Sequence, residues 1–373
     1  MSKACGRTAP ARPSEADPPR AGKPYRTLAD VAARAGVHVT TVSLALRGHP
    51  SIPPATRERI RVAAEAVGYR RDPQLDALNF HRVRQHKQPR STGSAFVVHA
   101  GATRFFDGMC YQPLVWEGAK AAAEAHGHSL EIFEVGRGRL EPARLNSILQ
   151  ARGVTGILLS TFEIDIGQLD LDWSRFTAVK IECLHLTPDL DCVSNDQMQV
   201  ARLAMRRLRA LGYRRIGLAT AREDEMRLAE SFGMGALIEQ AALCESECVP
   251  SLFFGLGDVP NLEEVIRQWI EKNRIDAVIS NWNELFEVFP KAGLRVPEDV
   301  AFAPLDVPPS MPGVAGVVQN HRLVGQRAME QLAIMAESHQ RGVPKTQTIT
   351  YVPGYWQDGR TAPPRQPFRT ALF

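Results

Sequence analysis

Residues 27–48 read TLADVAARAGVHVTTVSLALRG, a pattern that predicts two short helices joined by a tight turn. Thr27 can cap the first helix, and Asp30 three positions later completes a capping box. Gly36 supplies the positive φ that ends this helix, and the second helix is expected over 39–47. Two helices that cross at a glycine turn are typical of a helix-turn-helix, whose second helix enters the major groove of DNA.

A third helix is predicted directly after this pair. Pro54 suits the first turn of a helix, and Gly68-Tyr69 marks its end. An Ala-Gly turn alone also occurs in ordinary helical hairpins, so the third helix strengthens the interpretation as a small DNA-binding bundle. The residues expected to face its core are Val31, Ala32, Val42, Ala45, Leu46, Ile60, Ala63, Ala64 and Val67.

Charge is distributed unevenly along the chain. Residues 25–90 carry twelve Lys or Arg against five Asp or Glu, and residues 1–24 carry five against two. The whole chain has a net charge of +4, so the remaining residues have a net charge of −6. A basic head on an acidic body favours nucleic-acid binding by the head, with an ordinary solvated helical surface as the alternative. Residues 1–24, rich in Pro and charged residues, predict a disordered tail.

The N-terminal pattern resembles the lactose-repressor (LacI) family of bacterial transcription regulators. His38 stands where the family usually has a capping Ser, which should weaken the cap of the second helix. Leu44 stands where an Arg usually follows Thr-Val-Ser. The matching residues are Thr27-Leu28, Asp30-Val31-Ala32, Ala35-Gly36-Val37, Thr41-Val42-Ser43, Gly48, Thr56-Arg57-Glu58-Arg59-Ile60 and Gly68-Tyr69.

The resemblance and the side-chain chemistry together predict the DNA contacts. Thr40 and Thr41 offer hydroxyls to base edges, and Val39 can contact a thymine methyl group. Asp72-Pro73 can start a hinge helix, in which the resemblance places Leu78 as a minor-groove wedge; a plain linker helix is the alternative. The predicted DNA-binding residues are Thr27, His38, Val39, Thr40, Thr41, Ser43, Arg47, Tyr69, Leu75 and Leu78.

From residue 94 onward, apolar runs of strand length alternate with amphipathic helices, which indicates parallel sheets covered on both faces. About 280 residues are more than one domain with a single open sheet usually contains, so we expect an α/β body of two lobes with a cleft. Strands are expected over 95–99, 129–134, 154–160, 177–182, 215–220, 275–280 and 299–303. Helices are expected near 113–126, 141–151, 197–211, 229–243, 261–273, 284–292 and 321–341.

The predicted fold is an all-α helix-turn-helix domain followed by a two-lobed, periplasmic-binding-protein-like effector domain with parallel sheets. The resemblance to the LacI family continues over this body through Val193-Ser-Asn-Asp196, residues 208–216, residues 292–301 and Gln319. The expected parts are a tail (1–24), the DNA-binding domain (25–69), a hinge helix and linker (70–92) and an effector and dimerisation domain (93–373). Lobe one is assigned to 93–213 and 319–347, and lobe two to 214–318 and 348–373.

The effector site is expected beyond the carboxyl ends of the strands, where ligands of doubly wound sheets bind. The resemblance implies that Asp196 and Arg227 contact the effector. An aromatic wall beside carboxylate, amide and guanidinium groups suits a sugar or another polyhydroxy molecule. Alternatively, the aromatic residues belong to the cores and the charged residues to surface pairs. The predicted effector-binding residues are Phe105, Phe106, Asp196, Arg227, Trp282, Asn283 and Asp306.

Enzyme and metal chemistry find little support in the motifs. The chain contains no Gly-x-Ser-x-Gly, His-Glu-x-x-His or Walker-type motif. Its six cysteines show no Cys-x-x-Cys spacing, so we predict no metal site and no cofactor, and reduced thiols in a cytoplasmic protein. No signal peptide or membrane-length apolar run is present, so no membrane partner is expected.

We therefore predict a cytoplasmic, homodimeric transcription regulator, a repressor rather than an activator, and not an enzyme. Its partners would be a palindromic double-stranded operator and a small-molecule effector, with a carbohydrate as the first candidate. Effector binding would shift the lobes and alter the order of the hinge. The alternative is a small-molecule binding protein or α/β enzyme with a vestigial DNA-binding head.

Overall fold

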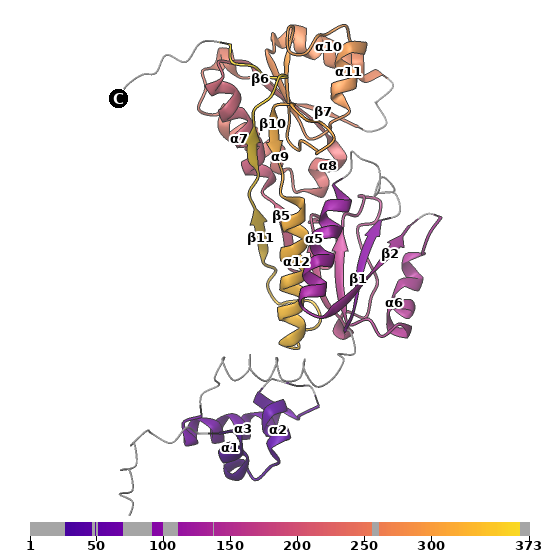
Figure 1. Ribbon diagram of the computed structural model, residues 1–373, viewed down its shortest axis with the longest axis vertical. Coiled ribbons are helices and arrows are strands. Elements are labelled where there is room, and N and C mark those ends of the chain that lie inside the picture. The colour runs from indigo at the N-terminus through magenta and orange to yellow at the C-terminus, as the bar shows by residue number, and fades with distance from the viewer. Residues whose placement is uncertain are drawn as a thin grey trace, which may run out of the picture. The chain divides into compact units, whose positions relative to one another are not determined.

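The computed structural model describes residues 27–46, 49, 51–69, 92–99, 111–136, 138–255 and 261–365 (Figure 1). The chain divides into two units, residues 1–82 and 83–373, and the division falls inside the predicted linker over 70–92. Five predicted site residues lie outside the described ranges: Arg47, Leu75, Leu78, Phe105 and Phe106.

The N-terminal unit contains three helices, α1 (Leu28–Ala35), α2 (Val39–Leu46) and α3 (Pro54–Val67). The predicted capping box is confirmed, because Thr27 Oγ1 accepts from the Asp30 backbone N–H and the Asp30 carboxylate accepts from the Thr27 N–H at 2.7 Å. Gly36 has a φ of 65° and ends α1. The buried core consists of Val31, Ala32, Val42, Ala45, Ile60, Ala63 and Ala64, and Leu46 and Val67 pack on it from partly exposed positions.

We call the second unit, residues 83–373, the effector unit. Its lobe one is built on a parallel sheet with the strand order β11-β5-β4-β3-β1-β2. Helices α5 (Gln112–Ala125) and α12 (His321–Glu337) cover one face, and α6 (Pro142–Ala151) covers the other. Alternate residues of β1 enter the two cores, since Phe96 and Val98 face α5 while Ala95 and Val97 face α6. The strands are β1 (Thr92–His99), β2 (His128–Val135), β3 (Gly156–Ser160), β4 (Thr177–Ile181), β5 (Cys192–Asn195) and β11 (Ile349–Val352).

Lobe two has a smaller parallel sheet with the order β7-β6-β8-β9. Helices α7 (Gln197–Ala210) and α9 (Ser231–Gln240) pack on one face, and α10 (Leu262–Asn273) and α11 (Leu285–Lys291) pack on the other. The short α8 (Arg222–Arg227) follows β6 directly. The strands are β6 (Ile216–Ala221), β7 (Leu252–Phe254), β8 (Ala277–Ser280) and β9 (Ala301–Pro304), with an antiparallel pair of β10 (Gly316–Val318) and β12 (Tyr355–Gln357).

Within the described ranges the chain passes between the lobes at three crossovers: from β5 to α7, from β10 to α12 and from β11 to β12. Helix α7 thus packs in lobe two and β11 pairs in lobe one, so the expected lobe boundaries at residues 213 and 348 move to about 196 and 353. Three of the four β11 side chains are exposed, so no apolar pattern marks this edge strand.

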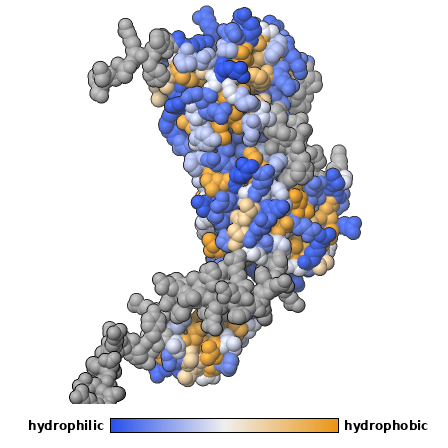
Figure 2. Space-filling view, viewed as in Figure 1, coloured by the Kyte–Doolittle hydropathy of each residue, from blue (hydrophilic) through white to orange (hydrophobic). Residues whose placement is uncertain are grey.

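The other predicted elements of the effector unit are present, with ends displaced by at most four residues. The predicted helix over 229–243 is shorter, and the separate α8 precedes it. The sequence prediction missed the short strands β5, β7, β10, β11 and β12, because three or four residues carry too little periodicity. None of the helices in the described ranges is long and apolar enough to span a bilayer. Figure 2 shows polar and apolar residues interspersed over both lobes.

Helices α5 and α12 approach each other through two glycines. A Cβ atom on Gly118 would lie 1.9 Å from the carbonyl oxygen of Arg322, and one on Gly325 would lie 1.9 Å from that of Val115. Backbone atoms cannot move aside as a flexible side chain can, so only glycine fits at these two positions. The close contact places the start of α12 beside the start of α5, where the candidate site lies.

The substitution Gly325→Ala should therefore lower the free energy of unfolding of the effector unit by about 1–3 kcal/mol, because the helices must separate. Urea denaturation followed by circular dichroism would measure the loss. Gly167→Ala is the matched control, since the added Cβ would meet no atom within 4 Å. Equal stabilities of the two variants would contradict this account of the helix contact.

Candidate effector cleft and DNA-binding face

The predicted DNA-contacting residues gather at the start of α2. Val39 and Thr40 are exposed, as is His38 just before the helix, and Thr41 and Ser43 are half-buried. Leu44 is also half-buried and is not among the core residues of the bundle. Thr27 is exposed at the start of α1, where its hydroxyl belongs to the capping box, and Tyr69 packs on the core from a half-buried position.

His38 takes the place of the expected serine cap of α2. Its Nδ1 atom lies 2.7 Å from Thr40 Oγ1 and accepts from the Thr40 backbone N–H at 3.4 Å. The His38 carbonyl also accepts from the Val42 N–H at 3.2 Å, as the residue before a helix should. At 3.4 Å, the contact from the Thr40 N–H is long for a capping hydrogen bond.

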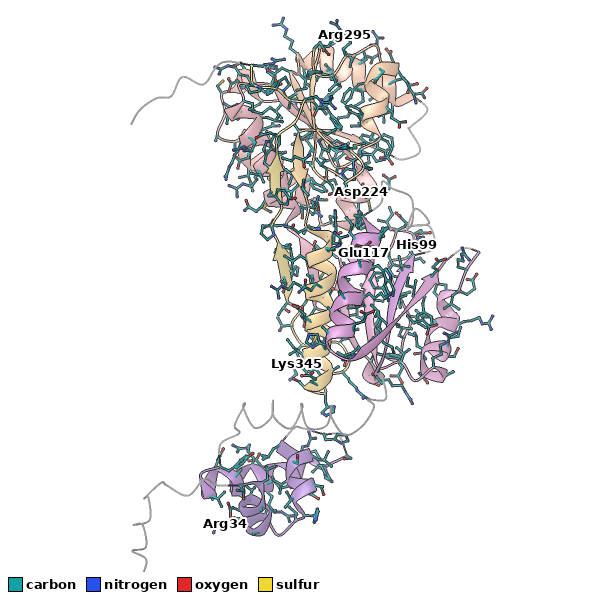
Figure 3. All side chains as sticks on the ribbon, in the orientation of Figure 1. Arg34, His99, Glu117, Asp224, Arg295 and Lys345 are labelled. Carbon is teal, nitrogen blue, oxygen red and sulfur yellow. The ribbon has the colours of Figure 1, made fainter. Side chains whose placement is uncertain are left out.

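The basic residues of the head differ in how far neighbouring acids compensate them. On α3, Arg61 donates to Glu58 at 2.6 Å and to Glu65 at 2.5 Å, so its charge is largely offset. Arg34, at the end of α1 in Figure 3, and Arg59 are exposed. These two arginines are better placed than Arg61 to meet phosphate groups.

The effector unit brings polar side chains together at the carboxyl ends of its strands, between the two lobes. Figure 3 shows Asp224, on α8, at the edge of lobe two that faces lobe one. We call this set the cleft cluster: Tyr111, Glu182, Asn195 and His321 from lobe one, and Asp224, Arg227, Asn281 and Asp306 from lobe two.

Asp306 and His321 form one link across the cleft. The Asp306 carboxylate lies 2.9 Å from His321 Nε2, and the imidazole stacks on Tyr111 with ring centroids 4.6 Å apart. Burial disfavours the protonated ring, but the charge and hydrogen bond of Asp306 outweigh burial, so the pKa of His321 is raised. In the neutral ring the proton belongs on Nε2, because Nδ1 faces the donating amide of Asn195 at 3.2 Å.

Arg227 forms a second link between the lobes. Its guanidinium donates to Asp224 Oδ1 at 2.8 Å within lobe two and to the Glu182 carbonyl at 3.3 Å in lobe one. The Tyr111 hydroxyl lies 3.4 Å away. Burial works against the charge, but the electrostatic attraction of Tyr111 and Asp224 outweighs it and raises the pKa of Arg227, which stays protonated. Asn281 donates to the other Asp224 oxygen at 2.8 Å.

Glu182 is buried in a strained backbone conformation, with a φ of 52° that residues other than glycine rarely adopt. Its Oε1 atom accepts from the backbone N–H of Asn195 at 3.1 Å and from the side-chain amide of the same residue at 2.7 Å. Backbone strain of this kind is concentrated at functional sites.

Of the seven predicted effector residues, the structure links Arg227, Asn283 and Asp306. Asn283 donates to the Asp306 carbonyl at 2.9 Å, and among the described residues its Oδ1 atom has no donor. Asp196 instead caps α7 by accepting from the Gln199 N–H at 3.0 Å. Trp282 packs on the core of lobe two, where its ring lies 5.4 Å from that of Phe254.

Sequence reasoning missed most of lobe one's contribution to the cluster. Glu182 directly follows β4, and Asn195 ends β5. The rule that selected Asn283 and Asp306, a polar residue at the end of a parallel strand, would also have found these two. The same rule does not select His321, because this residue begins the helix α12 and does not end a parallel strand.

A cavity of about 830 Å³ opens beside the cleft cluster. Asp306, His321 and Tyr111 line one side of it, and Met311 and Tyr355 are among the other lining residues. Gln319 also lines this cavity, and its buried Oε1 atom has no hydrogen-bond donor in the described part of the chain. The volume is typical of a small-molecule site, and the unused acceptor suits a ligand hydroxyl.

Two family models match the chain. Residues 27–72 match the model of bacterial regulatory proteins of the lacI family, and residues 105–333 match that of periplasmic binding proteins and the sugar binding domain of the LacI family. The chain belongs to the LacI family. The match covers both the helix-turn-helix head and the lobes that carry the cleft cluster.

Relatives and solved structures agree with this assignment. The maltose regulon regulatory protein MalI of Escherichia coli is 28% identical over 56% of this chain and 57% of MalI. The regulator GntR of Pseudomonas aeruginosa is 27% identical over 83% of this chain and 89% of GntR. The chain therefore spans little more than half of MalI but most of GntR.

Two solved structures have the same fold. The transcriptional regulator CelR in complex with cellobiose has a TM-score of 0.57 at 21% identity, over 90% of this chain and 99% of CelR. The lac repressor dimer bound to operator and the anti-inducer ONPF has a TM-score of 0.53 at 17% identity, over 91% and 99%.

The pair of Asp306 and His321 should make the stability of the effector unit depend on pH. Because the folded-state pKa of His321 is raised above its unfolded value of about 6.5, the pair stabilises fully below that pH. The contribution is lost as the pH rises through the folded-state pKa. In Asp306→Asn the His321 pKa should fall, as an NMR titration of the ring would show.

Asp299→Asn is the control for this titration, because it removes a carboxylate that pairs with Arg295 elsewhere in lobe two. It should leave the His321 pKa unchanged. A His321 pKa that is the same in the wild type and in Asp306→Asn would show that the ion pair does not control the titration.

Proposed function

We propose that this LacI-family protein is a cytoplasmic, dimeric transcription regulator that represses by binding a palindromic operator. A small molecule bound between the lobes would control its affinity for the operator. The cleft cluster supports this proposal most strongly, since one connected set of hydrogen bonds joins both lobes and a ligand there would change their relation.

The head supports DNA binding rather than a vestigial role. Its capping box, glycine turn and apolar core are complete. His38, Val39 and Thr40 are exposed together beside this packed core, as contact with DNA requires. The lac repressor dimer with a similar fold was solved on its operator, which is consistent with the same use of the fold here.

We propose a carbohydrate as the effector. CelR was solved with cellobiose, and the matched family model includes sugar binding domains. Carboxylate, amide and imidazole groups in the cleft cluster and beside its cavity offer both donors and acceptors to ligand hydroxyls. Asp306 and Arg227 are the proposed specificity-determining residues, because each would have to exchange an internal partner for a ligand group.

We also propose that the protein acts by binding rather than by catalysis. The relatives described above are named as regulators. In the cleft cluster Arg227 pairs with Asp224 and His321 pairs with Asp306, which suits recognition. Fold alone does not decide between binding and catalysis, so the proposal depends on these pairings.

Selection of bound genomic fragments would test operator binding directly. Binding of a palindromic duplex by the dimer, lost when residues 1–91 are removed, is the expected result. Sequence-independent binding, or binding by monomers, would contradict the proposal.

Leu44 provides a sharper test of the DNA-binding face. Leu44→Arg should strengthen DNA binding and steepen its salt dependence by about one phosphate contact per head. Val62→Arg is the matched control, because it adds the same charge to an exposed position on α3. Fluorescence anisotropy at several salt concentrations would measure both slopes. If the two variants change the slope equally, α2 is not the element that faces DNA.

The effector site can be tested with Asp306→Asn, which keeps the side-chain shape, and with Arg227→Lys, which keeps the charge but removes the guanidinium hydrogen bonds. A thermal-shift screen of maltose, cellobiose, other sugars and nucleobases should find a ligand that stabilises the wild type by about 2.7 kcal/mol at 100 times its Kd. Both variants should lose this stabilisation but keep operator binding. The control Asp299→Asn should keep both the stabilisation by the ligand and operator binding. If both site variants are still stabilised by the ligand, the effector site lies elsewhere.

A further inference from the structure

Lobe two contains a second cavity, which no part of the proposed regulator mechanism uses. It has a volume of about 580 Å³ and lies between α8, α9 and β7. Its lining residues are entirely different from those of the larger cavity beside the cleft cluster. Much of the lining is apolar, from Met226, Met234, Leu237, Val249 and Phe253.

A buried carboxyl group lines this apolar cavity. Glu225 is 4% exposed, and its Oε2 atom accepts from the Gly233 backbone N–H at 3.2 Å. Its Oε1 atom is buried and has no hydrogen-bond donor among the described residues. The hydroxyl of Thr220 lies close enough to lower the pKa of Glu225, but it donates its proton to Asn281 Oδ1 at 2.7 Å. A buried carboxylate with so few hydrogen bonds is poorly compensated for its lost hydration, so a cation in the cavity would stabilise its charged form.

The charged groups around the cavity favour a cation. Besides Glu225, the lining includes Glu230 and Arg222, both exposed, while its other polar members, Gln240 and Ser251, are uncharged. Burial raises the pKa of Glu225 to about 7 against the hydrogen bonds of Gly233 and Thr220, which lower it, and the charges of Asp224 and Glu230 add to the effect of burial. An ammonium group in the cavity would donate hydrogen bonds to the Glu225 carboxyl group. Its positive charge would also stabilise the ionised carboxylate.

We propose that this cavity is a second small-molecule site, which binds a primary amine on an apolar body. The ammonium group donates to the carboxylate of Glu225, and the apolar body packs against Met226, Met234 and Phe253. The cavity volume lies within the usual range for small ligands. The exposed side chains of Met226 (59%) and Leu237 (59%) also suit a protein surface, but a flat partner would leave the buried carboxyl unpaired.

Methionine methyl groups provide the measurement, since each cavity contains its own reporter. Met226 and Met234 line the proposed site, and Met311 lines the cavity beside the cleft cluster. The full-length protein, labelled with 13C at the methionine methyls, would be titrated with 2-phenylethylamine. Signals assigned through Met226→Leu and Met234→Leu should shift, and the Met311 signal should stay in place.

Matched probes and variants test the role of Glu225. The neutral 2-phenylethanol should bind at least tenfold more weakly than the amine, and the anionic 3-phenylpropionate should not bind. Glu225→Gln should weaken amine binding at least tenfold, and Glu230→Gln, at the exposed rim, should weaken it less. Gly233→Ala is a variant that keeps the helix, because its Cβ would lie 3.4 Å from the Phe253 ring and 3.5 Å from Glu225 Oε2. It should reduce affinity by narrowing the site.

The pH dependence gives an independent check. The amine stays protonated between pH 6 and 8, while Glu225 ionises around pH 7. Amine affinity should therefore be about tenfold higher at pH 8 than at pH 6 in the wild type, and this difference should disappear in Glu225→Gln.

Several outcomes would overturn the proposal. These are equal binding of the three probes, an unchanged affinity in Glu225→Gln, absence of binding at millimolar amine, or shifts confined to Met311. Shifts of Met226 and Met234 with protein concentration alone would show that a second copy of the chain covers the cavity. None of these outcomes bears on operator binding or on the sugar response, so the proposed regulator function would stand or fall separately.

Discussion

The side chain of Asn195, directly and through Asn320, links the three crossovers that connect the lobes in the described part of the chain. Its oxygen accepts from the Asn320 backbone N–H at 3.1 Å, and the Asn320 side chain donates to the Pro353 carbonyl. Its nitrogen donates to Glu182 and faces the ring of His321. A fully buried amide must keep all of these partners, because each lost one would leave a polar group unsatisfied. The spacing of the lobes and the position of His321 therefore depend on the same side chain.

Sequence reasoning succeeded where the decisive interactions are local. The capping box joins Thr27 and Asp30, three residues apart, and Gly36 needs only its own backbone conformation to end α1. Long strands and amphipathic helices of the effector unit were also predictable from their periodicity. The edge strand β11 was not, since its backbone pairs with β5 while most of its side chains remain exposed.

The candidate site shows the limit of such reasoning at single residues. Asn195 and Asp196 belong to one motif, but Asn195 ends the strand β5 while Asp196 follows it, and adjacent side chains point in different directions. Asn195 enters the cleft cluster, while Asp196 caps α7. The pairing of Asp306 with His321 joins two lobes and arises only when both sheets are in place. The residue type suggests such candidates from the sequence, but the tertiary fold determines which partners they contact.

The strained backbone of Glu182 has counterparts across the cleft. Ala229 and Glu230, which follow α8, also have left-handed φ values of 52° and 58°. Each residue held in this way stores about 1–3 kcal/mol. Coupling free energies between allosteric sites are typically about 1–3 kcal/mol as well. The fold thus holds, in segments of both lobes, conformational energy of the same size as the coupling between sites in allosteric proteins.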